Sequence, residues 1–395
     1  MKSEGDRRMG FGDDGTGMIR RGLLATGAAA VAAAPARGAL RRARARPLIV
    51  NALGGLENPN LALARPPGGA ADTSRPDVDA RAIADAKASG VSAVNITLGY
   101  VAGPENPYEN TIETIGTWDR DLRDHPADLI KVDRADDILR ARDEGKVGII
   151  YGFQNAVQIG DKLERIDVFG DLGVGVIQLT YNPANALGDG SMAHENRGLT
   201  PFGRQVIERL NANRIMVDLS HSGERTCLDA IAASSRPISI NHTGCRALTD
   251  LPRNKTDAEL RGVAEKGGFV GVFFMPFLNV SGHAGAEDVV AHIDHAVRVC
   301  GEDHVGIGTD GDVTGIDDLQ AYRGHLAHEV AERAKAGIGA TGERADTYPF
   351  VVDLRGVDQF RKLAGLLKAK GYAEPRIDKI LGLNFVAYAR EVWGA

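Results

Sequence analysis

Eight apolar segments of strand length recur along the chain, and most are followed by a longer segment with the period of an amphipathic helix. The strand candidates are residues 47–53, 91–98, 147–153, 174–181, 214–220, 237–241, 268–274 and 304–310. Because apolar strands joined by helices are typical of parallel sheets covered on both faces, eight such units predict a closed α/β fold, a TIM-like (β/α)8 barrel. An open doubly wound sheet is the alternative, but "NALGGLENPN" after the first strand lacks the glycine spacing of a phosphate-binding turn.

The first 46 residues are predicted to form an export signal and a basic linker, followed by a single barrel domain over residues 47–395. Arg20 and Arg21 precede the small-residue stretch "GLLATGAAAVAAAPARGA", which resembles a bacterial twin-arginine signal. We therefore expect export to the periplasm or the extracellular space. An alanine-rich leader or a later start is the alternative. Because no later segment reaches about 18 apolar residues, we expect no transmembrane segment.

Two connections are longer than ordinary barrel loops, namely residues 99–135 and 311–350. Both are polar and partly helical in pattern. Since long insertions after barrel strands usually lie over the active face, we expect them to border the mouth of the barrel. The region after residue 350 is expected to end in two packing helices.

Charge and cysteine content exclude several classes of function. The formal net charge of −6 provides no basic field for a nucleic acid, so we expect a small neutral or zwitterionic partner. The three cysteines, Cys227, Cys245 and Cys300, include no close pair, which argues against both a disulfide framework and a thiolate zinc site. Any metal ion would need nitrogen and oxygen ligands.

Polar side chains stand where three of the predicted strands end. His221 lies in "IMVDLSHSGERT", His242 in "PISINHTGCRAL" and Asp310 at the end of "HVGIGTD". Because the carboxyl ends of barrel strands converge on one mouth, two imidazoles and a carboxylate there could hold zinc with an open position for water. The alternative for each histidine is a structural role with satisfied hydrogen bonds. Arg253 in "LPRNKTD" could clamp a substrate carboxylate, or could be a solvated loop residue.

The other histidines are not expected to be ligands. His292 and His295 lie three residues apart on a predicted helix, which favours packing or surface roles. Loops and insertions contain four more histidines, His194, His283, His325 and His328, and none of these is expected to bind a metal ion.

The stretches "DLSH", "NH", "RN" and "GIGTDGD" resemble, in order and spacing, the membrane (renal) dipeptidase family of zinc peptidases, within the amidohydrolase-type barrels. The similarity is strong over residues 170–312 and looser through "LGLNFVAYAREVW". It implies an exopeptidase that hydrolyses dipeptides with two zinc ions and a bridging water. It also implies that His221 and His242 bind one metal ion, that Arg253 holds the substrate carboxylate, and that Asp310 handles the proton of the nucleophile.

Four positions depart from the family pattern. Leu53 and Gly55 replace a His-x-Asp pair that binds the other metal ion, and Gln154 in "YGFQNAV" replaces a bridging glutamate. Tyr181 in "IQLTYN" replaces a histidine that steadies the tetrahedral intermediate, and its phenol could donate to an oxyanion instead. Because two adjacent zinc ions need bridging anions, a dinuclear centre is not expected.

Two functions remain open. The first is a metal-dependent, dipeptidase-like hydrolase of a dipeptide or related small amide, with at most one zinc ion on His221 and His242, completed by Gln154 or Asp310 and water. The second is a catalytically inactive relative that binds an amino-acid-like ligand or a partner. The retained histidines with Arg253 and Asp310 favour the first, and the four substitutions favour the second. A homodimer is left open.

Overall fold

The computed structural model describes residues 46–63 and 78–395. Within these residues all eight predicted strands are present and pair in parallel. In order around the sheet they are β1 (Val50–Asn51), β2 (Ala93–Thr97), β4 (Val147–Phe153), β5 (Val174–Gln178), β6 (Met216–Asp218), β7 (Ser239–Thr243), β8 (Phe269–Val272) and β9 (Val305–Ile307). The amide of Ala52 donates to Ile307 O and that of Asp310 to Leu53 O, both at 2.9 Å, so the last strand meets the first. The fold is a (β/α)8 barrel.

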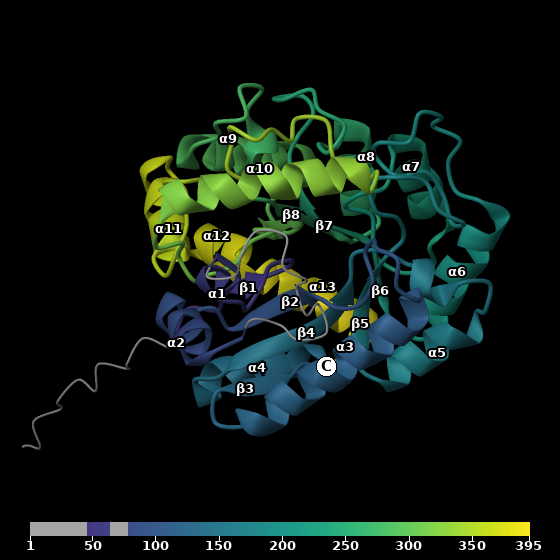
Figure 1. Ribbon diagram of the computed structural model, residues 1–395, viewed down its shortest axis with the longest axis horizontal. Helices are drawn as coiled ribbons and strands as arrows, with labels where there is room; N and C mark the ends of the chain where they lie inside the picture. Colours follow the sequence, from purple (N-terminus) through teal and green to yellow (C-terminus); the bar gives the residue numbers. More distant parts are fainter. Residues whose placement is uncertain (1–45, 64–77) are drawn as a thin grey trace, which may run out of the picture. The chain divides into compact units, whose positions relative to one another are not determined.

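Helices surround the strands in the described chain (Figure 1). The connecting elements are α1 (Pro59–Leu63), α2 (Ala80–Ser89), α3 (Pro107–Asp124), α4 (Ala135–Glu144), η1 (Val157–Ile159), α5 (Glu164–Asp171), α6 (Pro201–Ala212), α7 (Glu224–Ala233), α8 (Asp257–Glu265), η2 (Pro276–Leu278) and α9 (Ala286–Cys300). Local sequence fixes where they begin: the Thr200 hydroxyl accepts from Gly203 N–H, and Thr256 and Glu259 form a capping box. The predicted helices over residues 200–211 and 286–301 are confirmed as α6 and α9.

The first long insertion contains an element that the sequence did not reveal. Besides α3, residues 99–135 contain β3 (Leu129–Lys131), which pairs in parallel with β4 outside the barrel path. Only Leu129 of its three residues is fully buried, so no apolar run marked it. The second insertion contains α10 (Leu319–Lys335), which is helical as its pattern indicated.

The C-terminal region covers the amino-terminal end of the barrel with its last helix. It consists of α11 (Gln359–Ala369), α12 (Glu374–Asp378), η3 (Lys379–Leu383) and α13 (Asn384–Trp393). Phe385 and Tyr388 of α13 share one buried cluster with Ala93, Met216 and Phe269, the first residues of β2, β6 and β8. Because α13 covers the ends where strands start, the carboxyl ends remain for a site.

The predicted export signal and linker, residues 1–46, lie outside the described residues except for Arg46. Among the helices that the structure describes, none is both long and apolar enough to cross a membrane.

Candidate active site

A cavity of about 360 Å³ opens among residues that follow the strands. Five of the six side chains selected from the sequence line it: Gln154 after β4, Tyr181 after β5, His221 after β6, Arg253 after β7 and Asp310 after β9. The sixth, His242, is fully buried within β7 and contacts the cavity wall through His221. Insertion 311–350 contributes many lining residues, as expected, whereas no lining residue comes from residues 99–135.

His221 and His242 lie together. Their ring centroids are 4.9 Å apart and the ring planes are inclined by 59°. Two imidazoles bound to one tetrahedral ion would have centroids about 5 Å apart. His221 Nδ1 hydrogen-bonds Asn182 Oδ1 at 2.7 Å, the kind of contact that fixes the ring of a metal-binding histidine.

Three ring nitrogens of this pair lack partners in the part of the chain that the structure describes. They are His221 Nε2 and both nitrogens of His242. Since buried polar atoms are nearly always hydrogen-bonded, a satisfied structural histidine does not describe His242. Burial, followed by the charge of Arg253, lowers the pKa of each imidazole well below its usual value. Both rings are therefore neutral, the form that binds a metal ion.

Arg253 is buried, and no carboxylate of the described residues pairs with it. It is only 2% exposed, and its Nη1 donates to Ser220 O at 2.7 Å. Among the ion pairs of residues 46–63 and 78–395, none involves this guanidinium within 4 Å of a carboxylate. Burial lowers the pKa of Arg253, which Asp310 opposes. A ligand carboxylate would supply the missing partner.

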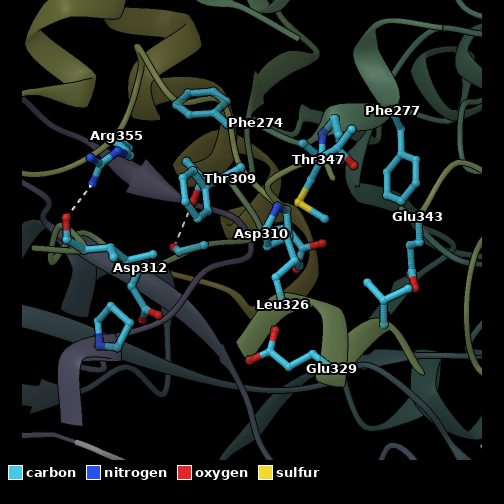
Figure 2. A pocket seen from close by; sticks show the side chains of 18 of the residues that line it. Phe274, Phe277, Thr309, Asp310, Asp312, Leu326, Glu329, Glu343, Thr347 and Arg355 are labelled. Carbon is cyan, nitrogen blue, oxygen red and sulfur yellow. Dashed lines mark hydrogen bonds between the residues drawn. The ribbon is translucent and has the colours of Figure 1, made fainter. Parts of the chain in front are cut away.

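Asp310 lines the cavity (Figure 2), and its backbone conformation is strained. Its φ of 56° falls in the left-handed region that a non-glycine residue rarely adopts. Burial raises the pKa of Asp310, while Arg253, Arg333 and a hydrogen bond from Gln154 oppose that rise. The Gln154 amide nitrogen also donates to Thr97 Oγ1 at 2.7 Å. Gln154 therefore orients the carboxyl group.

Tyr181 connects the histidines to a residue that the sequence did not reveal. Its ring stacks on His221 with centroids 4.2 Å apart. Its hydroxyl accepts from Nη1 and Nη2 of Arg333, each at 3.3 Å, and Arg333 in turn pairs with Glu343 at 2.7 Å. Burial raises the pKa of Tyr181, so the phenol keeps its proton and can donate it in a hydrogen bond. Arg333 lies on α10. The only sequence signal for its role was that the insertion 311–350, which contains it, was expected to border the mouth of the barrel.

The residues do not fit a two-metal centre. Leu53 is buried and offers no donor atom, and a Cβ on Gly55 would lie 2.0 Å from Asp312 Oδ1. The Asp312 oxygen also accepts from Glu57 N–H at 2.9 Å, and burial raises the pKa of Asp312 to about 6. Outside residues 1–45 and 64–77, no three His, Cys, Asp or Glu side chains are placed to hold one ion. This finding excludes Asp310, which the sequence had offered as a ligand, from sharing an ion with both imidazoles. The two imidazoles fit a single ion whose other ligands would be water or the oxygen of Gln154.

Comparison with known proteins agrees with the fold and identifies a family. The model of the family described as membrane dipeptidase, peptidase family M19, matches residues 83–337. An uncharacterized dipeptidase of Schizosaccharomyces pombe is 32% identical over 246 residues, which are 59% of each protein. The chain therefore spans about three fifths of that relative's length.

Two solved structures share the barrel over nearly its full extent. A Pseudomonas aeruginosa amidohydrolase is 30% identical with a TM-score of 0.74, covering 89% of this chain and 98% of that one. A Rhodobacter sphaeroides metallo peptidase, solved with a phosphinate mimic of the dipeptide L-Ala-D-Ala, is 21% identical with a TM-score of 0.68 and coverages of 88% and 100%. At 21% identity, the likeness to the Rhodobacter sphaeroides structure shows a shared fold and nothing more. Since the family model matches more than half of a chain whose strands follow the same barrel, this protein belongs to the membrane dipeptidase family, peptidase family M19.

Proposed function

We propose that the chain is a metal-dependent hydrolase that cleaves a dipeptide or related small amide with one zinc ion. The observation that carries the proposal is the buried pair His221 and His242. Their ring centroids are 4.9 Å apart, and three of their four ring nitrogens have no hydrogen-bond partner among the described residues. Arg253, which pairs with no described carboxylate, lines the same cavity as His221. A neutral imidazole pair beside an arginine that can bind a carboxylate is typical of a hydrolase site, whereas histidines in a structural core have their ring nitrogens hydrogen-bonded.

Each side chain has a distinct task in this proposal. Arg253 binds the carboxylate of the substrate and so orients the amide bond. Asp310, with its pKa raised by burial, accepts a proton from the attacking water and returns it to the leaving amine. The Tyr181 O–H donates to the oxygen that becomes negative. Zinc, when bound, would polarise the amide carbonyl and lower the pKa of a bound water.

A second candidate function is a non-catalytic receptor for an amino-acid-like ligand or a partner. The observation that favours it is the contact of Asp312 with Gly55, because a carboxylate from another loop fills the place of a family metal ligand. With Leu53 and Gln154 also changed, the anions that a second zinc ion needs are missing. The retained Arg253 would then serve binding alone.

Hydrolysis assays separate the two functions. The purified protein, reconstituted with zinc, is incubated with L,L and L,D dipeptides beside a chelator-treated sample and the His221→Ala variant. Dipeptide hydrolysis by the reconstituted protein that is lost both in the chelator-treated sample and in His221→Ala supports the hydrolase function. His283→Ala, which removes an exposed imidazole, is the matched control. Binding of dipeptides without turnover in the reconstituted protein would leave the receptor function alone.

Export and assembly are further proposals. Arg20, Arg21 and the alanine-rich stretch support export of a single barrel domain over residues 47–395. Amino-terminal sequencing of protein from the periplasmic fraction tests the signal, because a retained residue 1 would exclude cleavage. Light scattering of the same sample tests the homodimer.

A further inference from the structure

The cavity has a second polar region, away from the histidines, that no family motif includes. Thr314, Arg355 and Gln359 line this region. Figure 2 shows Arg355 on one side of Asp310 and Glu343 on the other. Glu343 binds Arg333, which contacts Tyr181, and Tyr181 stacks on His221. The side chains around Arg355 therefore lie across Asp310 from the imidazole end.

Two segments far apart in the sequence build this region. The loop after β9 carries Thr314 and Ile316, and Arg355 Nη1 donates to Ile316 O at 3.3 Å. Gln359 begins α11, four residues after Arg355. The Arg355 guanidinium also lies 5.7 Å from the centre of the Phe350 ring. The backbone bond and the ring together hold the guanidinium in place.

Three polar atoms in this region are buried without a hydrogen-bond partner among the residues described. They are Thr314 Oγ1, Arg355 Nε and Gln359 Nε2. Thr314 is 5% exposed and Gln359 is 2% exposed. Arg355 is half-buried as a whole, but its Nε atom is shielded from bulk water like the other two atoms. Because buried polar groups are rarely left unpaired, three such atoms in one cavity indicate a ligand group that pairs with them.

All three unpartnered atoms can donate a hydrogen bond. A guanidinium N–H, an amide NH2 and a hydroxyl form a set that matches the oxygens of a carboxylate. Within the described ranges Arg355 has no carboxylate partner closer than 4 Å. The nearby acid, Asp312, accepts from Glu57 N–H and lies against Gly55, so it is directed toward the first loop.

We propose that Thr314, Arg355 and Gln359 bind a second carboxylate of the substrate. This inference rests on the proposed hydrolase function and names its substrate class. With the terminal carboxylate on Arg253 and the scissile bond at Asp310, the second carboxylate belongs to the side chain of the amino-terminal residue. Apolar side chains that line the same cavity, including Leu326 and Phe350, suit the methylene groups of a glutamyl residue. The preferred substrates are dipeptides with an amino-terminal acidic residue.

The test compares L-Glu-D-Ala with L-Gln-D-Ala, which differ only in side-chain charge. On the zinc-loaded protein, kcat/KM is measured by amine release, and binding is measured separately by calorimetry. We expect a preference for the glutamyl peptide that falls roughly 10- to 100-fold in Arg355→Met, the range expected for a charge-assisted hydrogen bond. Arg361→Met removes an exposed arginine of α11 and is the matched control that keeps the preference.

Gln359→Glu provides a second variant, because it places an anion beside the bound carboxylate. Gln359→Glu should weaken the binding of the glutamyl peptide more than that of the glutaminyl peptide. A thermal melt of each variant verifies that it is folded. Equal binding of the two peptides, or a preference unchanged in Arg355→Met, would overturn the inference. If calorimetry shows Arg355-dependent binding without turnover, the hydrolase function fails while the carboxylate site stands. If turnover occurs without any Arg355 dependence, the hydrolase stands and this inference fails.

Discussion

The carboxylate of Asp312 occupies the space that a side chain on Gly55 would need, with its Oδ1 2.0 Å from the Cβ position. Residue 55 is where the dipeptidase pattern places an aspartate ligand, and Asp312 reaches the same place from the loop after β9. Because its oxygen accepts from Glu57 N–H, this carboxylate is held against the first loop. The absence of a side chain at Gly55 and the position of the Asp312 carboxylate are therefore coupled.

This coupling predicts that Gly55→Asp alone destabilises the protein. The new carboxylate would overlap and repel that of Asp312, and we expect a loss of about 1–3 kcal/mol in the free energy of unfolding. Asp312→Gly in the same chain should recover part of that loss. Urea unfolding of the wild type, the single variants and the double variant gives the interaction energy. Strict additivity of the two changes would contradict the contact.

Arg253→Met is predicted to lower kcat/KM for dipeptides by roughly 10- to 100-fold, because a buried charge-assisted pair with the substrate carboxylate is lost. A dipeptide with an amidated carboxyl terminus lacks that carboxylate, so the same substitution should lower kcat/KM for the amidated dipeptide far less. Steady-state kinetics on both substrates make the comparison. A similar loss on the amidated substrate would indicate that Arg253 supports the fold through Ser220 rather than the ligand.

Tyr181→Phe keeps the ring that stacks on His221 and removes only the hydroxyl. If that hydroxyl donates to the developing oxyanion, kcat should fall by about 10²- to 10³-fold with little change in KM. Single-turnover measurements separate the chemical step from product release. A change confined to KM would instead assign the phenol and its Arg333 contact to ground-state binding.

Acid stability should depend on His292. Its Nδ1 accepts from Cys245 N–H at 2.8 Å and its Nε2 donates to Leu278 O at 3.0 Å, so only the neutral ring fits. Burial lowers the pKa of His292 to about 4, whereas the unfolded chain titrates near 6.5. The unfolded state therefore gains the proton first, and the contribution of this group to stability is lost as pH falls from 6.5 towards 4.

The His292 effect is expected to reach about 3 kcal/mol at its full extent. Urea unfolding at several pH values should show a slope in this window that is smaller in His292→Gln, where the lowered pKa values of His221 and His242 still contribute. Equal slopes in the two proteins would show that the ring titrates normally.

Much of the fold and half of the site could be predicted from the sequence for one physical reason. Buried parallel strands are apolar and their carboxyl ends converge, so His221, His242 and Asp310 could be placed together although the chain separates them. That reasoning also explains why β3 was missed, since it is short and only Leu129 is fully buried.

The remaining site residues lie in segments without periodicity. Arg333 and Arg355 reach the cavity from the second insertion and the segment after it, and their positions depend on contacts with Tyr181 and Ile316 that no local pattern encodes. The contact between Gly55 and Asp312 joins residues at opposite ends of the barrel sequence. Such relationships appear only when the barrel closes.

The number of zinc ions per chain tests the central claim most directly. The purified protein is reconstituted with zinc, dialysed and measured by mass spectrometry beside His221→Ala, His242→Ala and the control His283→Ala. We predict one ion in the wild type and the control and none in the two site variants. Two ions in the wild type, no ion in it, or one ion that survives His242→Ala would contradict a single metal held by this imidazole pair.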